Sequence, residues 1–266
     1  MFMSEKDPTM KRKILFCLAS AADLLMPRHC AVCGGKLLTN EKHLCIWCSY
    51  GLPLTYFWLE SRNIMADRLN AIIQDNMVNG TAPQEPYSFA MALYHFSSPD
   101  TYGNISKSLK YHGNLSIGRK FAGMLAEKIR KCAYMGPVDA VVPVPLHRAR
   151  LRQRGYNQAE VIAAEIAAAL GCRLESKMLR RVKKTESQTR LASKDRKENV
   201  SGAFSVVGSI AEKYAVKHVH ILLVDDVFTT GATLGECHKV LRRWFSSRGI
   251  PADELRISVA SLAFAG

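Results

Sequence analysis

The strongest constraint on the fold is an apolar segment that leads, through a short turn, into an amphipathic helix near the end of the chain. The segment Val219–Val224 is almost wholly apolar, which is typical of a strand buried on both faces of a parallel sheet. The segment Thr233–Phe245 has apolar residues at helical spacing, and Thr233 with Glu236 forms the pattern of a capping box. A buried strand followed by a helix is the repeating unit of an α/β domain.

The same alternation of strand and helix patterns extends over the chain after residue 87. Predicted strands cover Ala90–Phe96, Asp139–Val144 and Arg256–Phe264, and predicted helices cover Ile117–Cys132 and Asn157–Leu170. Asn157 and Glu160 form the pattern of a second capping box, and Gly171 stands where that helix should end. We therefore expect an α/β fold with a mostly parallel sheet flanked by helices.

Two adjacent acids and a loop of small residues follow the buried strand. Asp225 and Asp226 stand at its expected carboxyl end, where open parallel sheets bind their ligands. The loop Thr229–Thr233 precedes a helix, so its free amides can bind a phosphate while the acids hold sugar hydroxyls. The alternative is a strand, a turn and a capped helix without a ligand, but two acids after a buried strand are costly without a partner. This segment therefore predicts a sugar-phosphate site.

Four cysteines near the amino terminus have the spacing of metal ligands. They form two C-x-x-C pairs, Cys30 with Cys33 and Cys45 with Cys48. Two such pairs complete a tetrahedral sulfur site that suits structural zinc and leaves no open position for catalysis. The alternatives are two disulfides, which a cytoplasmic setting disfavours, or four inert thiols, which the paired spacing disfavours. His29 and His43 are close enough in sequence to compete as ligands, but we expect them to be bystanders.

The amino-terminal segment 1–26 has two interpretations. Its basic residues before an apolar stretch resemble a secretory signal, but Asp23 and the helical spacing of the apolar residues favour an amphipathic helix that docks on a core. No run of about 18 apolar residues occurs, so the sequence predicts no membrane-spanning helix. We therefore expect a cytoplasmic protein whose cysteines are reduced or bind metal.

These patterns divide the chain into four expected segments. They are an amphipathic helix at 1–26, a four-cysteine zinc finger at 27–58, a linker or variable region at 59–87, and an α/β domain at 88–266. The linker is predicted from the polar stretch Gln74–Pro86, which contains glycine and prolines.

The positive charge of the chain is concentrated in two segments. Lysine and arginine number 37 and aspartate and glutamate 23, for a formal net charge of +14. Most of the excess lies in Arg148–Arg154 and Lys177–Lys197. A charge that served solubility alone would be spread along the chain, so we expect an anionic partner such as a phosphate compound or nucleic acid.

The sequence around the two acids resembles a known motif. V-D-D-V-F-T-T-G-A-T, from Val224 to Thr233, looks like the phosphoribosyl pyrophosphate (PRPP) motif of type I phosphoribosyltransferases. Further segments are similar to the ComF family of competence-associated proteins, namely Leu109–Gly113, Val141–His147, Arg152–Gln158, Gln188–Leu191 and Arg196–Phe204. With the four-cysteine pattern, the resemblance covers nearly the whole chain outside residues 61–86.

The resemblance implies a type I phosphoribosyltransferase-like sheet at 88–266, preceded by a small zinc-ribbon or knuckle module. It implies that Asp225 and Asp226 are the catalytic acids and hold the ribose hydroxyls, with Thr229, Thr230, Gly231, Ala232 and Thr233 around the 5-phosphate. It also implies that pyrophosphate meets the amides of Val144, Leu146 and His147 and the cations Lys110 and Arg148. Mg²⁺ would bridge pyrophosphate and ribose oxygens. The basic run Lys183–Lys197 matches the place of a mobile loop that closes over PRPP.

Three functions fit these features. The first is a transferase that moves phosphoribose from PRPP to an unknown acceptor. The second is a largely non-catalytic, PRPP-responsive protein that handles single-stranded DNA in natural competence, through Arg148–Arg154 and Lys177–Lys197, with competence-machinery proteins as partners. The third is a zinc-ribbon interaction protein whose α/β domain has lost its ligand. The motifs identify no general base for an acceptor, so the sequence leaves the choice between enzyme and binding protein open.

Overall fold

The computed structural model describes residues 27–75, 85–96, 102–111, 115–183, 201–215 and 218–266. The chain divides into two compact units, Met1–Leu52 with Ser98–Ile105, and Pro53–Ser97 with Ser106–Gly266. The expected helix at 1–26 and most of the basic run Lys183–Lys197 lie outside the described residues. The first unit contains the four-cysteine segment, and the second contains the α/β domain.

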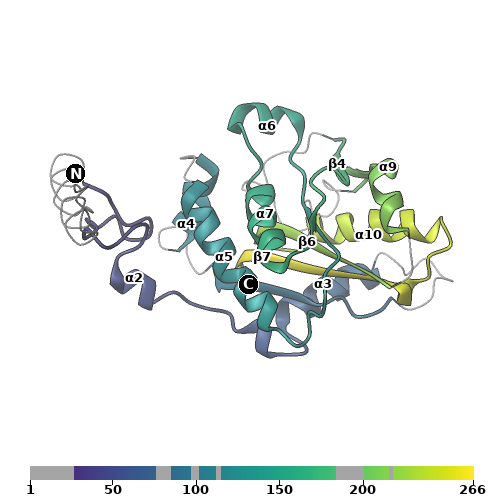
Figure 1. Ribbon diagram of the computed structural model, residues 1–266, viewed down its shortest axis with the longest axis horizontal. Helices are drawn as coiled ribbons and strands as arrows, with labels where there is room; N and C mark the ends of the chain where they lie inside the picture. The colour runs from purple at the N-terminus through teal and green to yellow at the C-terminus, as the bar shows by residue number, and fades with distance from the viewer. Residues whose placement is uncertain (1–26, 76–84, 97–101, 112–114, 184–200, 216–217) are drawn as a thin grey trace, which may run out of the picture. The chain divides into compact units, whose positions relative to one another are not determined.

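The second unit is built on a five-stranded sheet in the order β1-β7-β6-β2-β3, and every neighbouring pair of strands is parallel (Figure 1). The strands are β1 (Ala90–His95), β2 (Ala140–Pro143), β3 (Arg173–Leu174), β6 (Val219–Phe228) and β7 (Leu255–Phe264). The predicted α/β class and the predicted strands are confirmed. Strand β7 is buried along almost its whole length, because both of its neighbours and both helical layers cover it.

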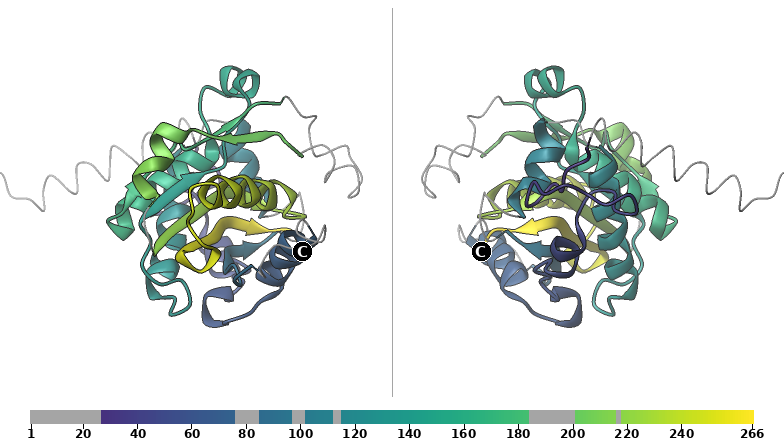
Figure 2. Two further views of the ribbon diagram at one scale, coloured as in Figure 1. Left: turned by 90° about the vertical axis from the view of Figure 1, so that its right-hand side faces the viewer. Right: turned by 90° about the vertical axis from the view of Figure 1, so that its left-hand side faces the viewer.

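Helices cover both faces of this sheet (Figure 2). On one face α5 (Leu115–Lys131) packs against α7 (Gln158–Leu170), and on the other α3 (Ile64–Asp75) packs against α10 (Ala232–Ser246). The predicted ends of α7 are confirmed. The side chain of Asn157 accepts a hydrogen bond from the Ala159 amide at 3.2 Å, and Gly171 ends the helix with a left-handed φ of 69°.

Strand β6 is longer than its apolar run predicts. It continues past Val224 through both acids to Phe228, because Val227 and Phe228 pair in register with the last residues of β7. Asp225 and Asp226 are therefore part of the strand rather than of the loop that follows it.

The predicted capping box of α10 is wrong. The N-cap is Gly231, so Thr233 lies inside the first turn of the helix. The carboxylate of Glu236 accepts a hydrogen bond from the Gly202 amide at 2.8 Å, so its hydrogen bond goes to the segment before β5 and not to the start of α10.

Part of the expected linker at 59–87 is helical. Ile64–Asp75 forms α3, whose start is capped by Asn63, since the Asn63 side chain accepts from the Ala66 amide at 3.0 Å. The helix forms because Met65, Leu69 and two further residues bury an apolar face against the sheet and α10. Residues 76–84 lie outside the described ranges.

Smaller elements complete the described fold. They are α2 (Ile46–Tyr50), α4 (Gly103–Tyr111), α6 (Arg148–Arg154), α9 (Gly208–Ala211), an antiparallel pair β4 (Leu179–Arg181) and β5 (Phe204–Val206), and 3-10 turns at Phe57–Leu59, Glu212–Tyr214 and Ala252–Glu254. Among the helices in the described ranges, none has the length and apolar character needed to cross a membrane.

Candidate functional site

The sheet topology makes β2 and β6 neighbours, and their carboxyl ends are the candidate position for a ligand. From β2 the chain crosses through α7 to β3 on one side, and from β6 it crosses through α10 to β7 on the other. The two strands are neighbours, with Pro143 opposite Val224. Open parallel sheets bind ligands outside the carboxyl ends of strands at such a switch point. The fold therefore brings together the loop after β2 and the acids of β6, as the predicted sugar-phosphate site requires.

The two acids of β6 face opposite sides of the sheet, because neighbouring residues of a strand alternate. The carboxylate of Asp226 forms an ion pair of 2.6 Å with the Nζ of Lys110, in the last turn of α4. Burial lowers the pKa of Lys110, but the carboxylates of Asp226 and Asp225 outweigh that effect and raise the pKa overall. Tyr156 donates a hydrogen bond to the carbonyl of Leu109, which ties α4 to the segment after α6. The structure thus places Lys110 beside the acid pair.

Asp225 is half-buried, whereas its neighbour Asp226 is buried. Burial, followed by the charge of Asp226, raises the pKa of Asp225 to about 7, although its Oδ1 accepts a hydrogen bond from the Asp226 amide at 2.9 Å. Near neutral pH this carboxyl group therefore changes its protonation state readily. In either protonation state the carboxyl group can hydrogen-bond to a hydroxyl. A cationic centre or a metal that approaches it would favour the deprotonated, negatively charged form.

The loop after β6 turns sharply at a glycine. Gly231 has a φ of +80°, and a Cβ at this position would lie 2.6 Å from the Phe228 ring and 3.0 Å from a methyl group of Ile72. No other residue type fits both the conformation and the space. Thr230 caps the turn through its hydroxyl, which accepts from the Ala232 amide at 3.4 Å. The loop ends at the N-terminus of the 15-residue helix α10, an arrangement suited to an anion.

The loop after β2 corrects one expectation. The amide of Val144, predicted to meet pyrophosphate, donates a hydrogen bond to the Val224 carbonyl at 2.8 Å, so the sheet uses it. The Val144 carbonyl accepts from the side chain of Asn157 at 3.0 Å. In the part of the chain that the structure describes, the amides of Leu146 and His147 have no hydrogen-bond acceptor. They are thus the donors that this loop can offer to a ligand.

The arginine-rich segment forms the short helix α6, which stands clear of the sheet (Figure 1). His147 caps it, because its Nδ1 accepts from the Ala149 amide at 3.3 Å. Arg148 is exposed, whereas Arg150 and Arg154 are half-buried, and the charge of Arg154 acts to lower the pKa of Lys110.

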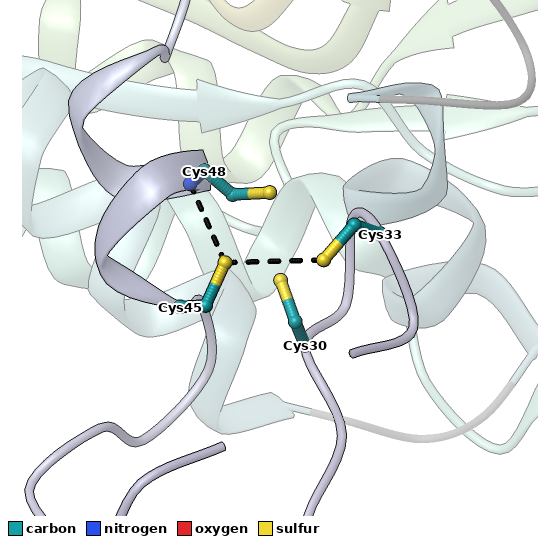
Figure 3. A group of neighbouring side chains, drawn as sticks. All are labelled: Cys30, Cys33, Cys45 and Cys48. Carbon is teal, nitrogen blue, oxygen red and sulfur yellow. Dashed lines mark hydrogen bonds between the residues drawn. The ribbon is translucent and has the colours of Figure 1, made fainter. Parts of the chain in front are cut away.

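The four cysteines converge on one point in the first unit (Figure 3). Their sulfur atoms all lie within 4.8 Å of one another, and the group includes neither His29 nor His43. The Sγ atoms of Cys33 and Cys45 are 3.8 Å apart. Tetrahedral zinc with Zn–S bonds of about 2.3 Å would place its sulfurs about 3.8 Å apart. The four thiols can therefore hold a metal ion.

Local hydrogen bonds shape both cysteine pairs. Gly34, with a left-handed φ of 71°, turns the first pair, and the Sγ of Cys45 accepts from the Cys48 amide at 3.5 Å in the second. Burial raises the pKa of the Cys30 thiol, but hydrogen bonds from backbone groups of the finger lower it to about 7 overall. Between the pairs, the carboxylate of Glu41 accepts from the amides of Leu38 and Ile46 at 2.7 and 2.6 Å. These bonds orient the thiols toward a common centre.

The parallel sheet, its switch-point site and the cysteine cluster define an α/β protein with a finger that can hold a metal ion. The chain is 33% identical over 164 residues to Competence protein F of Haemophilus influenzae, which covers 60% of this chain and 69% of that protein. This similarity shows that the chain belongs to the ComF family.

Two other relatives match more of the chain at lower identity. DNA utilization protein YhgH of Escherichia coli (strain K12) is 25% identical over 80% of this chain and 84% of its own length. Competence protein ComFC of Bacillus subtilis is 26% identical over 77% of this chain and 74% of its own length. No family model matches the sequence.

Proposed function

We propose that the α/β domain binds PRPP together with Mg²⁺ at the switch point between β2 and β6. The observation that carries this proposal is the order in which structural features follow one another at the end of β6. Two acids, one of them paired with Lys110, are followed within a few residues by a glycine turn and the N-terminus of α10. This order matches the two ends of ribose 5-phosphate, since the acids suit the hydroxyls and the loop suits the phosphate.

Each part of the site has a role in this proposal. Asp225 and Asp226 accept hydrogen bonds from the ribose hydroxyls, while Thr229–Thr233 bind the 5-phosphate. The amides of Leu146 and His147, with Lys110, receive the pyrophosphate group, and Val144 fixes the loop through the sheet. Bound Mg²⁺ would neutralise phosphate charge, and the oxygen-rich acid pair is the kind of ligand set that it prefers.

The chemistry that this arrangement favours is displacement at the anomeric carbon of PRPP. The bond from that carbon to the pyrophosphate oxygen breaks, and its electron pair leaves with the pyrophosphate. A nucleophile of the acceptor forms the new bond to the carbon. Positive charge develops on the sugar beside the acids, while negative charge develops on the leaving group beside Lys110. The proposed activity is accordingly that of a phosphoribosyltransferase.

PRPP with Mg²⁺ is expected to raise the melting temperature of the protein, because it binds only the folded state. A ligand at about 100 times its dissociation constant stabilises by about 2.7 kcal/mol, which raises the melting temperature of a domain of this size by about 5–10 °C. Differential scanning fluorimetry measures the shift, with ribose and Mg²⁺ alone as controls. No shift at millimolar PRPP would contradict the proposal.

A second function is favoured by α6 and by the names of the relatives. The exposed residues Arg148 and Arg152 lie on a short helix that stands clear of the sheet, as a contact to a nucleic-acid backbone requires. Relatives of the chain are named for competence and for DNA utilization. We propose that α6 binds single-stranded DNA, which would couple PRPP binding to DNA handling.

Replacing both Arg148 and Arg152 with glutamine is expected to lower the affinity for single-stranded DNA and to make that affinity less dependent on salt. Each lost phosphate contact should lower the slope of log affinity against log salt by about 0.7. Fluorescence anisotropy with a labelled oligothymidine, at several salt concentrations, measures both effects. The matched control is Lys120→Gln on α5, which removes an exposed charge at a distance in sequence from α6. An unchanged slope in the double variant would remove α6 from the DNA contact.

The metal in the finger is proposed to be zinc, because four thiolates in a closed tetrahedral set suit this ion and leave no position for a substrate. The spacing of the Cys33 and Cys45 sulfurs supports this choice. A cytoplasmic location, which the cysteine usage predicts, would keep these thiols reduced.

A further inference from the structure

One oxygen atom of the acid pair is covered by Lys110. The Oδ2 atom of Asp226 lies 2.6 Å from the Nζ of Lys110. This oxygen is buried, and it accepts no hydrogen bond from any other group in the described ranges. The side chain of Lys110 is 27% exposed, so the ammonium group lies between the carboxylate and solvent. A ribose hydroxyl or Mg²⁺ can therefore reach this oxygen only if the ammonium group moves away.

Two consecutive residues hold the end of α4 beside the loop that follows β2. The hydroxyl of Tyr156 donates a hydrogen bond to the carbonyl of Leu109, the residue before Lys110. The side chain of the next residue, Asn157, donates to the carbonyl of Val144 at 3.0 Å. Because these two bonds start from adjacent residues, the backbone of Lys110 lies close to the loop that is proposed to receive pyrophosphate.

The same loop is also joined to the strand that carries the acids. The amide of Val144 donates to the carbonyl of Val224 at 2.8 Å, two residues before Asp226. Lys110 is thus placed between a carboxylate and the pyrophosphate loop. The lysine side chain has a flexible four-carbon stem, so its ammonium group can exchange one anionic partner for another while the helix stays in place. A partner is needed in each position, because an unpaired charge is costly in a partly buried site.

We infer that Lys110 changes its partner when PRPP binds, from the carboxylate of Asp226 to the pyrophosphate group. This inference rests on the proposed function and gives Lys110 a second role, which is to select intact PRPP. Pyrophosphate takes up the charge of the lysine, while a ribose hydroxyl and Mg²⁺ take up the carboxylate, so neither charge is left unpaired. Ribose 5-phosphate and pyrophosphate each supply only one of these two partners. Each of them must break the ion pair without full compensation, and each therefore binds more weakly than its contacts alone would allow.

Isothermal titration with PRPP, inorganic pyrophosphate and ribose 5-phosphate, each with Mg²⁺, tests the inference. Lys110→Met keeps an apolar stem and removes the charge. Its affinity for PRPP and pyrophosphate should fall by about 10- to 100-fold, the loss typical of a charged hydrogen bond. Its affinity for ribose 5-phosphate should instead rise by about 3- to 10-fold, which is the gain expected if Asp226 is free of the lysine for about a third to a tenth of the time in the wild type.

The opposite signs distinguish a change of partner from a general attraction of anions, which would lower both affinities. The matched control is Lys107→Met, which removes an exposed lysine one turn earlier on α4. This variant should keep all three affinities within about twofold of the wild type.

The reciprocal variant is Asp226→Asn, which releases the lysine from its ion pair. Its affinity for pyrophosphate should rise by about 3- to 10-fold, while its affinity for ribose 5-phosphate should fall. Asp225→Asn removes a charge from the neighbouring residue but leaves the ion pair, so it should raise the pyrophosphate affinity less. These titrations are made at pH 8, above the raised pKa of Asp225. They also test the inference if Lys110→Met does not fold.

Two outcomes would overturn the inference while the wild type binds PRPP, and both would leave the proposed function intact. One is an affinity of Lys110→Met for ribose 5-phosphate that is unchanged or lower. The other is an equal gain in pyrophosphate affinity in Asp226→Asn and Asp225→Asn, which would reduce the effect to net charge. Failure of the wild type to bind PRPP would remove the proposed function itself, and the inference with it.

Discussion

Cys30→Ser is expected to remove the metal ion and unfold the finger while the α/β domain remains folded. The described part of the first unit has few buried apolar side chains, among them Val32, Leu37 and Leu44. Such a core is too small to hold a fold by itself, so metal binding supplies the stability. Structural zinc contributes about 10–16 kcal/mol in small zinc modules, which makes this the largest effect that we expect.

Metal analysis and limited proteolysis measure this result. The wild type should carry one equivalent of zinc and resist cleavage between the two cysteine pairs. Cys30→Ser should carry little zinc and be cleaved there, while the α/β domain survives as a fragment. Cys172→Ser is the matched control, because Cys172 is a half-buried thiol outside the cluster. One full equivalent of zinc in Cys30→Ser would refute the assignment of the site.

Asp225→Asn is expected to stabilise the protein while it weakens PRPP binding. The pKa of Asp225 is raised to about 7 in the folded protein, from an ordinary value of 3.8. Folding therefore favours the protonated form, and this contribution to stability is lost as the pH rises from about 4 to about 7. Asparagine resembles the protonated acid, so the variant keeps that contribution at every pH. Its free energy of unfolding should exceed that of the wild type by about 2–4 kcal/mol at pH 8.

Urea denaturation between pH 4 and pH 8 measures this difference, which should be small at pH 4 and grow as the pH rises. The same variant should bind PRPP about 10- to 100-fold more weakly at pH 8, because a neutral amide replaces a charged acceptor for a ribose hydroxyl. Asp253→Asn is a suitable control, because it changes an acid in the 3-10 turn before β7. A stability difference that does not depend on pH would contradict the assignment.

Much of the α/β domain could be predicted from local patterns. The run Val219–Val224 and the caps of α7 are properties of neighbouring residues, and the structure reproduces both. The acids and the small-residue loop could be found for the same reason, since strand, acids, turn and helix follow one another without interruption. The cysteine cluster was equally accessible, because its spacing alone indicates the geometry of the ligands.

The errors arose where contacts distant in sequence decide the structure. The role of Val144 depends on register, because its amide lies opposite the Val224 carbonyl. Helix α3 was not predicted, because it lies beside a polar stretch that indicates a linker. Its residues Met65, Leu69 and Ile73 nevertheless recur at the spacing of a helical face.

Helix α3 also limits how the chain can change during evolution. The Cγ2 methyl group of Ile72 lies 2.6 Å from where a Cβ at position 235 would stand, and another methyl group of the same side chain crowds position 231. Alanine can therefore enter α10 at position 235 only if position 72 becomes smaller in the same lineage. Substitutions at position 72 of α3 are therefore expected to covary with substitutions at position 235, in the first turn of α10.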